Sequence, residues 1–325
     1  MKGRDLERFD ASFLLLLVVA GLAVPFLLTG YNIKLATSIA IQAGLAAALG
    51  LVVGPGGLIS IGHAAFYGVA AYLFAMIAPQ TEPANLLVTA FAAIAGASVF
   101  AAIVGAISIR SRGLYFVLMT LAFGQLGYHL FNDTGIGGSA DGTYISFRPE
   151  LRLPGYVLEF EKPIPFYLLV FIVVAGVVAL CWWLRRSAFG SILIAARDNE
   201  ARIRAFGFSP YLFRLTAFVV SGAMAGAMGY LTAAQHGFVA PQMLAWQASA
   251  TALVMVLIGG KDTVSGPLVG AILLLIAEEI LQRMTEYWLV GVGLIIVAVV
   301  IAAPQGLVPL VARALAWLRL RARHA

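Results

Sequence analysis

The pattern in this chain closest to a chemical motif is a glycine–glycine–lysine run, because a lysine after glycines is typical of phosphate-binding loops. Gly259, Gly260 and Lys261 form the run. The rest of the pattern fails, since Met255 stands where the first loop glycine belongs and Asp262 replaces the serine or threonine that would hold magnesium. The chain has no other glycine–lysine pair. We therefore expect no nucleotide site and no ATP hydrolysis by this chain.

Other residue patterns that support catalysis are equally weak. The sequence has no His-Glu-x-x-His motif, and its four histidines lie far apart, so we expect no metal site and no cofactor. Cys181 is the one cysteine; it excludes an intramolecular disulfide and is most simply a core residue. Glu278 and Glu279 fall near the end of an apolar segment, where interfacial carboxylates are favoured over a buried ion site.

The composition indicates a membrane protein. Of 325 residues, 62% are hydrophobic and 11% are charged, against about a quarter charged in soluble domains. Repeated apolar runs approach the roughly 20 residues that a membrane helix needs. The net charge of +6 comes from basic residues scattered at the ends of these runs, so we expect contact with the lipid bilayer and no nucleic-acid partner.

We predict an all-α polytopic membrane protein with about ten transmembrane helices, forming a single transmembrane domain over residues 1–325. The apolar run that follows the charged N-terminal residues continues to Leu28, which favours a retained first helix over a cleaved signal peptide. The predicted spans are 12–29, 34–53, 59–78, 85–109, 113–131, 164–184, 213–233, 243–258, 264–282 and 286–303.

The basic residues orient these spans. With a cytoplasmic N-terminus, 16 of the 21 lysines and arginines fall inside, including those of a tail over 304–325. The external residues are Lys34, Arg148, Arg152, Lys162 and Arg283. Because cytoplasmic loops carry an excess of basic residues, both termini are predicted to be cytoplasmic and the loop 132–162 external. That loop contains the glycine-rich sequence TGIGGSADGT, which indicates a connecting loop, with an outer gate or a partner surface as alternatives.

The sequence between the sixth and seventh predicted spans breaks the apolar character. Residues 185–214 hold six arginines against Asp198 and Glu200, so this run must lie outside the hydrocarbon, on the cytoplasmic side. Asp198 and Arg202, like Glu200 and Arg204, stand four apart, which supports a helix, and Gly207 provides a stop. Apolar residues recur at helical spacing: Phe189, Ile192, Leu193, Ala196 and Ile203.

These features predict a short amphipathic helix within the cytoplasmic segment 187–210. Two interpretations remain open: a solvated loop that obeys the positive-inside rule, and a docking element for a soluble partner. The apolar face favours docking, because a loop that only enters water has no need of Phe189, Ile192 and Leu193 on one side.

A few polar residues interrupt the predicted spans. Gly54, Pro55, Gly56 and Gly57 end a helix, either at a tight cytoplasmic turn or at an interrupted helix beside a transport path. Ser60 and His63 follow, and a lone histidine there is more often packed and hydrogen-bonded than a ligand. Gln125 lies in the middle of the fifth span and must face another helix or a cavity. The candidates for a translocation path are Ser60, His63 and Gln125.

Four stretches together resemble the membrane subunits of branched-chain amino acid ABC importers, in particular the longer of the two paired permeases. They are GPGGLISIGHAAFYGVAAY at 54–72, RSRGLYFVLMTLAFGQ at 110–125 with GGSADG at 137–142, RSAFGSILIAARDNEARIRAFGFSPYLFRLTAFVVSGAMAGAMGYL at 186–231, and GGKDTVSGPLVGAILLLIAEEIL at 259–281. They follow the family's order over most of the chain from the second span onward.

The resemblance implies a permease of a bacterial inner membrane that pairs with a homologous second permease, two ATPase subunits and an extracytoplasmic solute-binding protein. It implies that 187–207 is the coupling helix, related to a Glu-Ala-Ala loop that fits a groove on the ATPase. Glu200, Ala201 and Gly207 match that loop, whereas Arg202 departs from its second alanine. The implied ATPase-coupling residues are Phe189, Ile192, Leu193, Arg197, Asp198, Asn199, Glu200, Ala201, Arg204 and Gly207.

The resemblance implies branched-chain amino acids as the solute, with urea, amides or aromatic acids as alternatives that related permeases carry. A secondary transporter driven by an ion gradient is a rival, but it would need ionisable residues deep in several helices, and the centres of these spans hold almost none. An intramembrane enzyme ranks lowest, because the sequence shows no catalytic pairing of residues.

Overall fold

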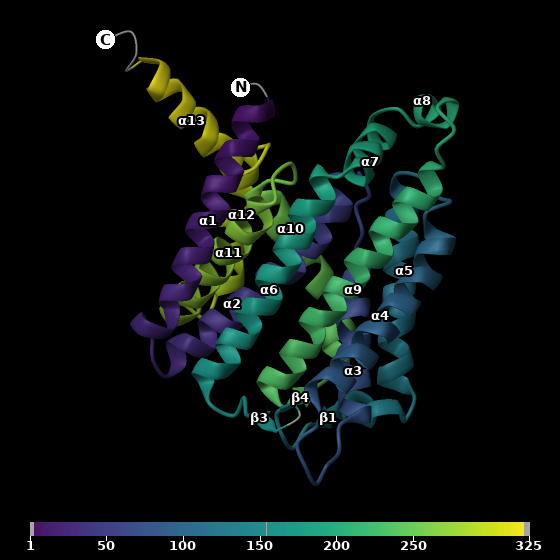
Figure 1. Cartoon of the computed structure of the whole chain (residues 1–325), viewed down its shortest axis with the longest axis vertical. Coiled ribbons are helices and arrows are strands. Elements are labelled where there is room, and N and C mark those ends of the chain that lie inside the picture. The colour runs from purple at the N-terminus through teal and green to yellow at the C-terminus, as the bar shows by residue number, and fades with distance from the viewer. Residues whose placement is uncertain (1–2, 154, 322–325) are drawn as a thin grey trace.

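The computed structural model describes the backbone of residues 3–153 and 155–321 and the side chains of 9–152 and 155–315, and most of the chain is helical (Figure 1). Lys2 and Arg323, which contributed to the predicted charge asymmetry, lie outside the described residues. The α-helices are α1 (Gly3–Leu27), α2 (Tyr31–Val53), α3 (His63–Ile77), α4 (Leu86–Ser108), α5 (Leu114–Asp133), α6 (Pro163–Arg186), α7 (Ala188–Asp198), α8 (Glu200–Ala205), α9 (Pro210–His236), α10 (Trp246–Gly259), α11 (Ser265–Met284), α12 (Trp288–Ala302) and α13 (Leu307–Arg321).

Seven of the described helices are long and apolar enough to cross a membrane: α1, α2, α4, α5, α6, α9 and α11. Helices α12 and α13 meet the same criterion only as a pair, bent by 45° at their junction. Helices α3 and α10 are apolar but have 15 and 14 residues, shorter than the roughly 20 that a straight crossing requires. Each predicted span coincides with a helix, and the total of about ten crossings stays a prediction.

Small residues allow the central helices to pack closely. Helices α2 and α9 are the most buried of the seven span-length helices, and α9 packs against α3 and α4. A Cβ on Gly222 would lie 2.4 Å from the Cβ of Ala101, and one on Gly226 would lie 2.6 Å from the Cβ of Ala97. The two glycines one turn apart on α9 therefore bring its backbone against α4, as such pairs do in membrane helices.

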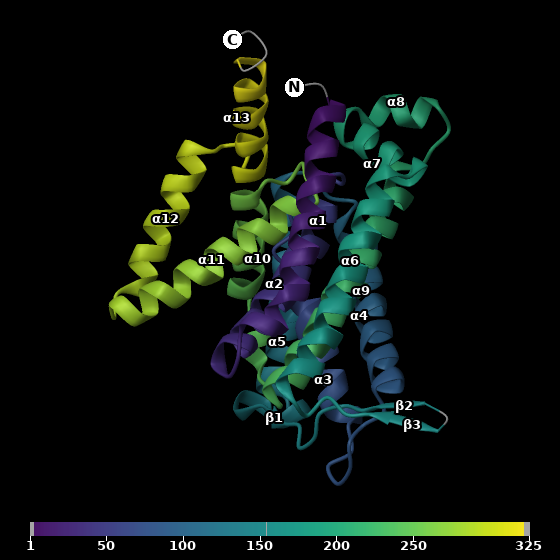
Figure 2. The same ribbon diagram turned by 60° about the vertical axis from the view of Figure 1, so that its left-hand side comes forward.

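The bundle has two different ends (Figures 1 and 2). Helices α7 and α8, the start of α1 and helix α13 lie at one end, called here the α7–α8 end. The opposite, strand end carries the two short antiparallel pairs and the 3-10 helix η1 (Ile136–Asp141). Strand β1 (Thr143–Tyr144) pairs with β4 (Phe238–Val239), and β2 (Leu151–Leu153) pairs with β3 (Tyr156–Leu158). A second 3-10 helix, η2 (Pro241–Leu244), follows β4.

Cys181 and Glu279 lie in the environments that the sequence predicted, a packed core and the end of a membrane helix. Cys181 of α6 is buried, with its Sγ 3.6 Å from the carbonyl oxygen of Ala47 on α2. Glu279 accepts hydrogen bonds from the Tyr31 hydroxyl at 3.1 Å and from the Arg283 guanidinium at 2.7 Å. Glu279 is thus held by an exposed ion pair of the kind that forms at a helix end.

Candidate functional site

The polar segment between α6 and α9 forms two short helices at the α7–α8 end (Figure 1). The Ser187 hydroxyl accepts the backbone N–H of Gly190 at 3.3 Å and so caps the start of α7. The turn from α6 is tight, since a Cβ on Gly190 would lie 2.3 Å from the Leu184 carbonyl oxygen. At the other end Gly207 has φ +85°, just before α9 begins at Pro210, so the predicted stop is confirmed.

The predicted amphipathic helix is divided into two helices, α7 and α8, because the chain breaks at Asn199. This residue has extended backbone angles (φ −153°, ψ 96°), and its Oδ1 accepts the N–H of Arg202 at 3.0 Å, capping α8. The break also removes the spacing on which the expected Asp198–Arg202 pair depended. Asp198 instead pairs with the neighbouring Arg197 at 3.1 Å.

The apolar face of this segment packs on the chain's own helices. Leu193 and Ala196 are fully buried and Ile203 is nearly so. The Phe189 ring lies 5.5 Å, centroid to centroid, from the ring of Phe213 on α9. This face holds α7 and α8 against the bundle, and burial leaves Leu193 no surface for a second protein in this structure. Phe189 and Ile192 are only half-buried, so their docking role stays a prediction.

Arg197 points from the end of α7 into two loops of the bundle. Its Nη1 donates to the Gly54 carbonyl oxygen at 2.7 Å and lies 3.5 Å from Oδ1 of Asp262. The side chain lies across Gly57, where a Cβ would sit 2.5 Å from the Arg197 Cγ. Arg185 of α6 also donates to the Asp262 backbone carbonyl. The Gly54–Gly57 turn and the loop around Asp262 thus meet at this arginine.

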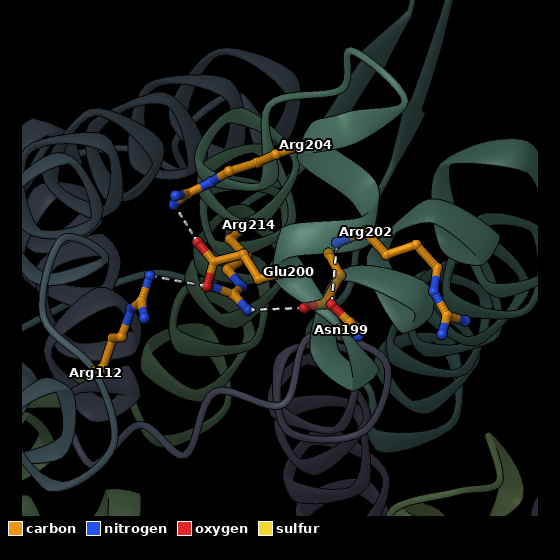
Figure 3. Close-up of polar contacts among 7 residues, drawn as sticks. Arg112, Asn199, Glu200, Arg202, Arg204 and Arg214 are labelled. Atoms are coloured by element: carbon orange, nitrogen blue, oxygen red, sulfur yellow. Dashed lines mark hydrogen bonds and ion pairs between the residues drawn. The ribbon is translucent and has the colours of Figure 1, made fainter.

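Glu200 is the centre of a second cluster, drawn in Figure 3. Its Oε1 is 2.5 Å from Arg204, and its Oε2 is 3.3 Å from Arg112 and 3.4 Å from Arg214. Arg112 belongs to the α4–α5 turn and Arg214 to α9. Arg214 also donates to the Ala196 carbonyl oxygen at 3.1 Å. The carboxylate is 21% exposed, and its charge is matched within the chain.

The exposed surface of the segment is different in character. Ala201 and Arg202 are exposed, and the Arg202 guanidinium points away from the Glu200 cluster (Figure 3). Among the described residues, no hydrogen bond or ion pair to that guanidinium is present. Phe206 is 71% exposed and Phe208 is 44% exposed. Apolar rings beside arginines form the surface that remains accessible.

Ser60 and His63 lie together in a closed polar network between helices. Ser221 of α9 donates its hydroxyl proton to the Ala48 carbonyl oxygen at 2.6 Å, so its Oγ accepts the His63 Nε2–H at 2.8 Å. The other ring nitrogen, Nδ1, then accepts the Ser60 hydroxyl at 2.9 Å. Both residues are fully buried. The neutral imidazole therefore has both ring nitrogens occupied, and the packed interpretation of His63 is confirmed.

Gln125 differs from the other two candidates for a translocation path. It follows Gly124 on α5, where α5 lies close to the start of α3: a Cβ on Gly124 would be 3.6 Å from the Gly62 Cα. Its Nε2 is buried without a hydrogen-bond partner among the described residues. Buried polar groups are normally paired, so an unpaired amide requires an explanation. Of the three predicted path residues, Gln125 alone has a polar atom without a partner among the described residues, and the path role of all three stays a prediction.

Sequence reasoning missed several residues that hold this end of the molecule together. The carboxylate of Asp10 on α1 is 4% exposed and accepts the N–H groups of Val264 and Ser265, each at 3.0 Å, and the Ser265 hydroxyl. An unpaired acid at the edge of the first apolar run was a usable signal. Asp262 and Arg112 gave no such signal, because their partners lie far away in the sequence.

Comparison with known proteins gives one consistent result. Residues 31–300 match the family model described as a branched-chain amino acid transport system permease component. The chain is 32% identical over 324 residues to the high-affinity branched-chain amino acid transport system permease protein LivM of Escherichia coli K12, covering 92% of this chain and 75% of that protein. LivM of Salmonella typhimurium is 31% identical over 322 residues with the same coverage.

A more limited similarity links the chain to another importer. The autoinducer 2 import system permease protein LsrC of Yersinia pestis (strain Pestoides F) is 32% identical over 119 residues, which is 34% of each chain. No solved structure matches the chain at a significant level.

Proposed function

The chain belongs to the family of permease components of branched-chain amino acid transport systems and is a permease subunit of an ABC importer, and from this premise we propose how it works. It forms half of a path for branched-chain amino acids across a bacterial inner membrane and pairs with a homologous second permease. Two ATPase subunits bind at the α7–α8 end, and an extracytoplasmic solute-binding protein delivers the solute at the strand end.

One observation carries the docking part of this proposal: the arginine-rich run 185–214 places its two short helices, α7 and α8, at one end of an otherwise apolar bundle. Its exposed side presents Arg202 together with Phe206 and Phe208. A partner surface with an apolar pocket surrounded by acidic residues would complement this side. Opposite charges steer association, and the aromatic side chains supply buried contact area. The docking surface proposed here is centred on the exposed residues Ala201, Arg202, Phe206, Gly207 and Phe208, with the half-buried Phe189 and Ile192 at its edge.

The distribution of basic residues supports a cytoplasmic location for this end. Arg110 and Arg112 lie in the α4–α5 turn there, together with the six arginines of residues 185–214. The strand end carries fewer basic residues, among them Arg148, Arg152 and Lys162. An excess of arginine and lysine on one side marks the cytoplasmic side.

The ATPases must be separate chains, because the glycine–lysine run at 259–261 lacks the other residues of a phosphate-binding loop. Closure of the ATPases would displace α7 and α8, and the helices would follow as rigid bodies. Gln125, whose Nε2 has no partner among the described residues, is our candidate for contact with the passing solute.

Charge reversal at one exposed position tests the docking surface. The chain is produced with its partner subunits, and co-purified ATPase and ATP-dependent leucine uptake into proteoliposomes are measured. Arg202→Glu is expected to reduce both by about tenfold, as loss of a charge pair at an interface does. Lys162→Glu is the matched control at the strand end and should leave ATPase co-purification unchanged.

Two results would contradict the proposal. Normal co-purification and uptake with Arg202→Glu would remove α8 from the docking surface. Leucine uptake driven by an ion gradient, without the ATPase subunits, would establish a secondary transporter instead.

A further inference from the structure

We propose that Arg197 and Glu200 are positioning residues that carry the movement of α7 and α8 into the bundle, and that neither side chain contacts the ATPase. The inference rests on the proposed function, in which the exposed side of α7 and α8 binds the ATPase. It gives a role to the side chains of the same two helices that face the bundle.

Glu200 connects three parts of the chain through one carboxylate. The interacting arginines come from α8 (Arg204), from the α4–α5 turn (Arg112) and from α9 (Arg214). A carboxylate offers about four acceptor sites, and three guanidinium groups around it leave little capacity for another cation. Arg214 is 15% exposed and also donates to the end of α7 at Ala196, so it fixes both short helices to α9.

Arg197 makes the equivalent connection on the other side of the break. It reaches the Gly54 carbonyl in the turn between α2 and α3, and Asp262 in the turn between α10 and α11. Its side chain packs across Gly57 and is 32% exposed, so the guanidinium would leave the Gly54 carbonyl if it turned outward. Hydrogen bonds from a charged donor are about twice as strong as neutral ones, which suits a connection that must transmit force.

Together the two residues connect the segment to most of the central bundle. Arg197 lies at the end of α7, Glu200 begins α8, and the extended residue Asn199 separates them. A displacement of α7 and α8 therefore acts on the α2–α3 and α10–α11 turns through Arg197, and on α9 and the α4–α5 turn through Glu200. These are contiguous physical links of the kind that couple distant sites.

The variant Glu200→Gln tests this assignment, because it keeps the shape of the side chain and removes its charge. Glu279→Gln is the matched control: Glu279 is also ion-paired, is 19% exposed, and lies near the opposite end of α11 from the Asp262 turn. Three quantities are measured in the assembled importer: co-purified ATPase, ATP hydrolysis, and leucine transported per ATP hydrolysed.

For Glu200→Gln we expect normal ATPase co-purification and continued hydrolysis, with about a tenfold fall in leucine transported per ATP, in the range of coupling within one charge network. Arg197→Gln should behave in the same way. The double variant Glu200→Gln with Arg214→Gln should lose no more than Glu200→Gln alone, because residues of one network act together. Glu279→Gln should leave all three quantities unchanged.

Two outcomes would overturn the inference. Loss of ATPase from Glu200→Gln would show that this residue contacts the partner, and would leave the proposed function standing. An unchanged ratio of leucine to ATP would show that it transmits nothing. If Glu200→Gln is absent from the membrane, Arg112→Gln is tested in its place, because the Arg112 guanidinium is 73% exposed and not part of the core. An unchanged ratio of leucine to ATP for Arg112→Gln would equally overturn the inference.

Discussion

Replacing Asp10 should loosen the connection between α1 and the start of α11. The buried carboxylate of Asp10 accepts the backbone N–H groups of Val264 and Ser265, and the Ser265 hydroxyl. It therefore occupies the N-terminus of α11, where free N–H groups and the helix dipole favour a negative charge. Asp10→Ala removes every acceptor at once, whereas Asp10→Asn keeps one carbonyl oxygen and loses the charge.

The magnitude follows from the groups that are left without a partner. A buried donor that loses its acceptor costs about 1–3 kcal/mol. Two backbone N–H groups are affected in Asp10→Ala, so we expect a loss of about 3 kcal/mol in the free energy of unfolding. In Asp10→Asn one N–H group keeps its acceptor, and we expect about 1.5 kcal/mol.

The free energy of unfolding is measured by denaturant titration in mixed micelles, followed through the helical signal. Asp133→Asn is the control, because that aspartate is 58% exposed and its replacement should change nothing measurable. Equal stability of the wild type and Asp10→Ala would refute the reasoning. So would a larger loss for Asp10→Asn than for Asp10→Ala.

Three further substitutions test packing and polar pairing. Gly229→Ala should destabilise the protein by about 1–3 kcal/mol in the same titration, because a Cβ there would lie 1.8 Å from a backbone carbonyl oxygen of α3. Gly176→Ala is the control and should be neutral, since the space around that residue is open. Equal effects of the two substitutions would contradict the packing. Ser221→Ala should lower the free energy of unfolding by about 1–3 kcal/mol, because Nε2 of the buried His63 loses its partner. Ser98→Ala is the control, since it removes a hydroxyl that is bonded only to its own helix. A neutral result for Ser221→Ala would mean that water or another group replaces the hydroxyl. Gln125→Leu should keep or raise stability, because an unpaired amide is removed, while leucine uptake falls; unchanged uptake would exclude Gln125 from the path.

The sequence was sufficient to locate the helices and the polar segment. Long apolar runs limited by Arg110, Arg185 and Gly207 determine where the chain enters and leaves the hydrocarbon, and those limits depend on local composition. The packing of Gly222 and Gly226 was also predictable, because small residues one turn apart have few other uses in a membrane helix. The fold class follows from features of this kind, whereas the family follows from the resemblance of the four stretches between residues 54 and 281.

The direction of the side chains in the α7–α8 segment could not be predicted in the same way. An amphipathic pattern shows that Leu193 lies on an apolar face but not which surface covers it. The partners of Glu200, namely Arg112 and Arg214, become neighbours only after α4, α5 and α9 have packed. The break at Asn199 was predictable, since asparagine before an acidic first turn is a typical N-cap.

Photo-crosslinking from α8 in intact membranes tests the central claim most directly. A photoreactive amino acid replaces Phe206, which is 71% exposed at the α7–α8 end, and in a parallel sample Tyr156, which is 76% exposed at the strand end. We predict that position 206 crosslinks to the ATPase subunit and that position 156 does not. Crosslinking of the ATPase from position 156, or none from position 206 in an importer active in transport, would contradict the account.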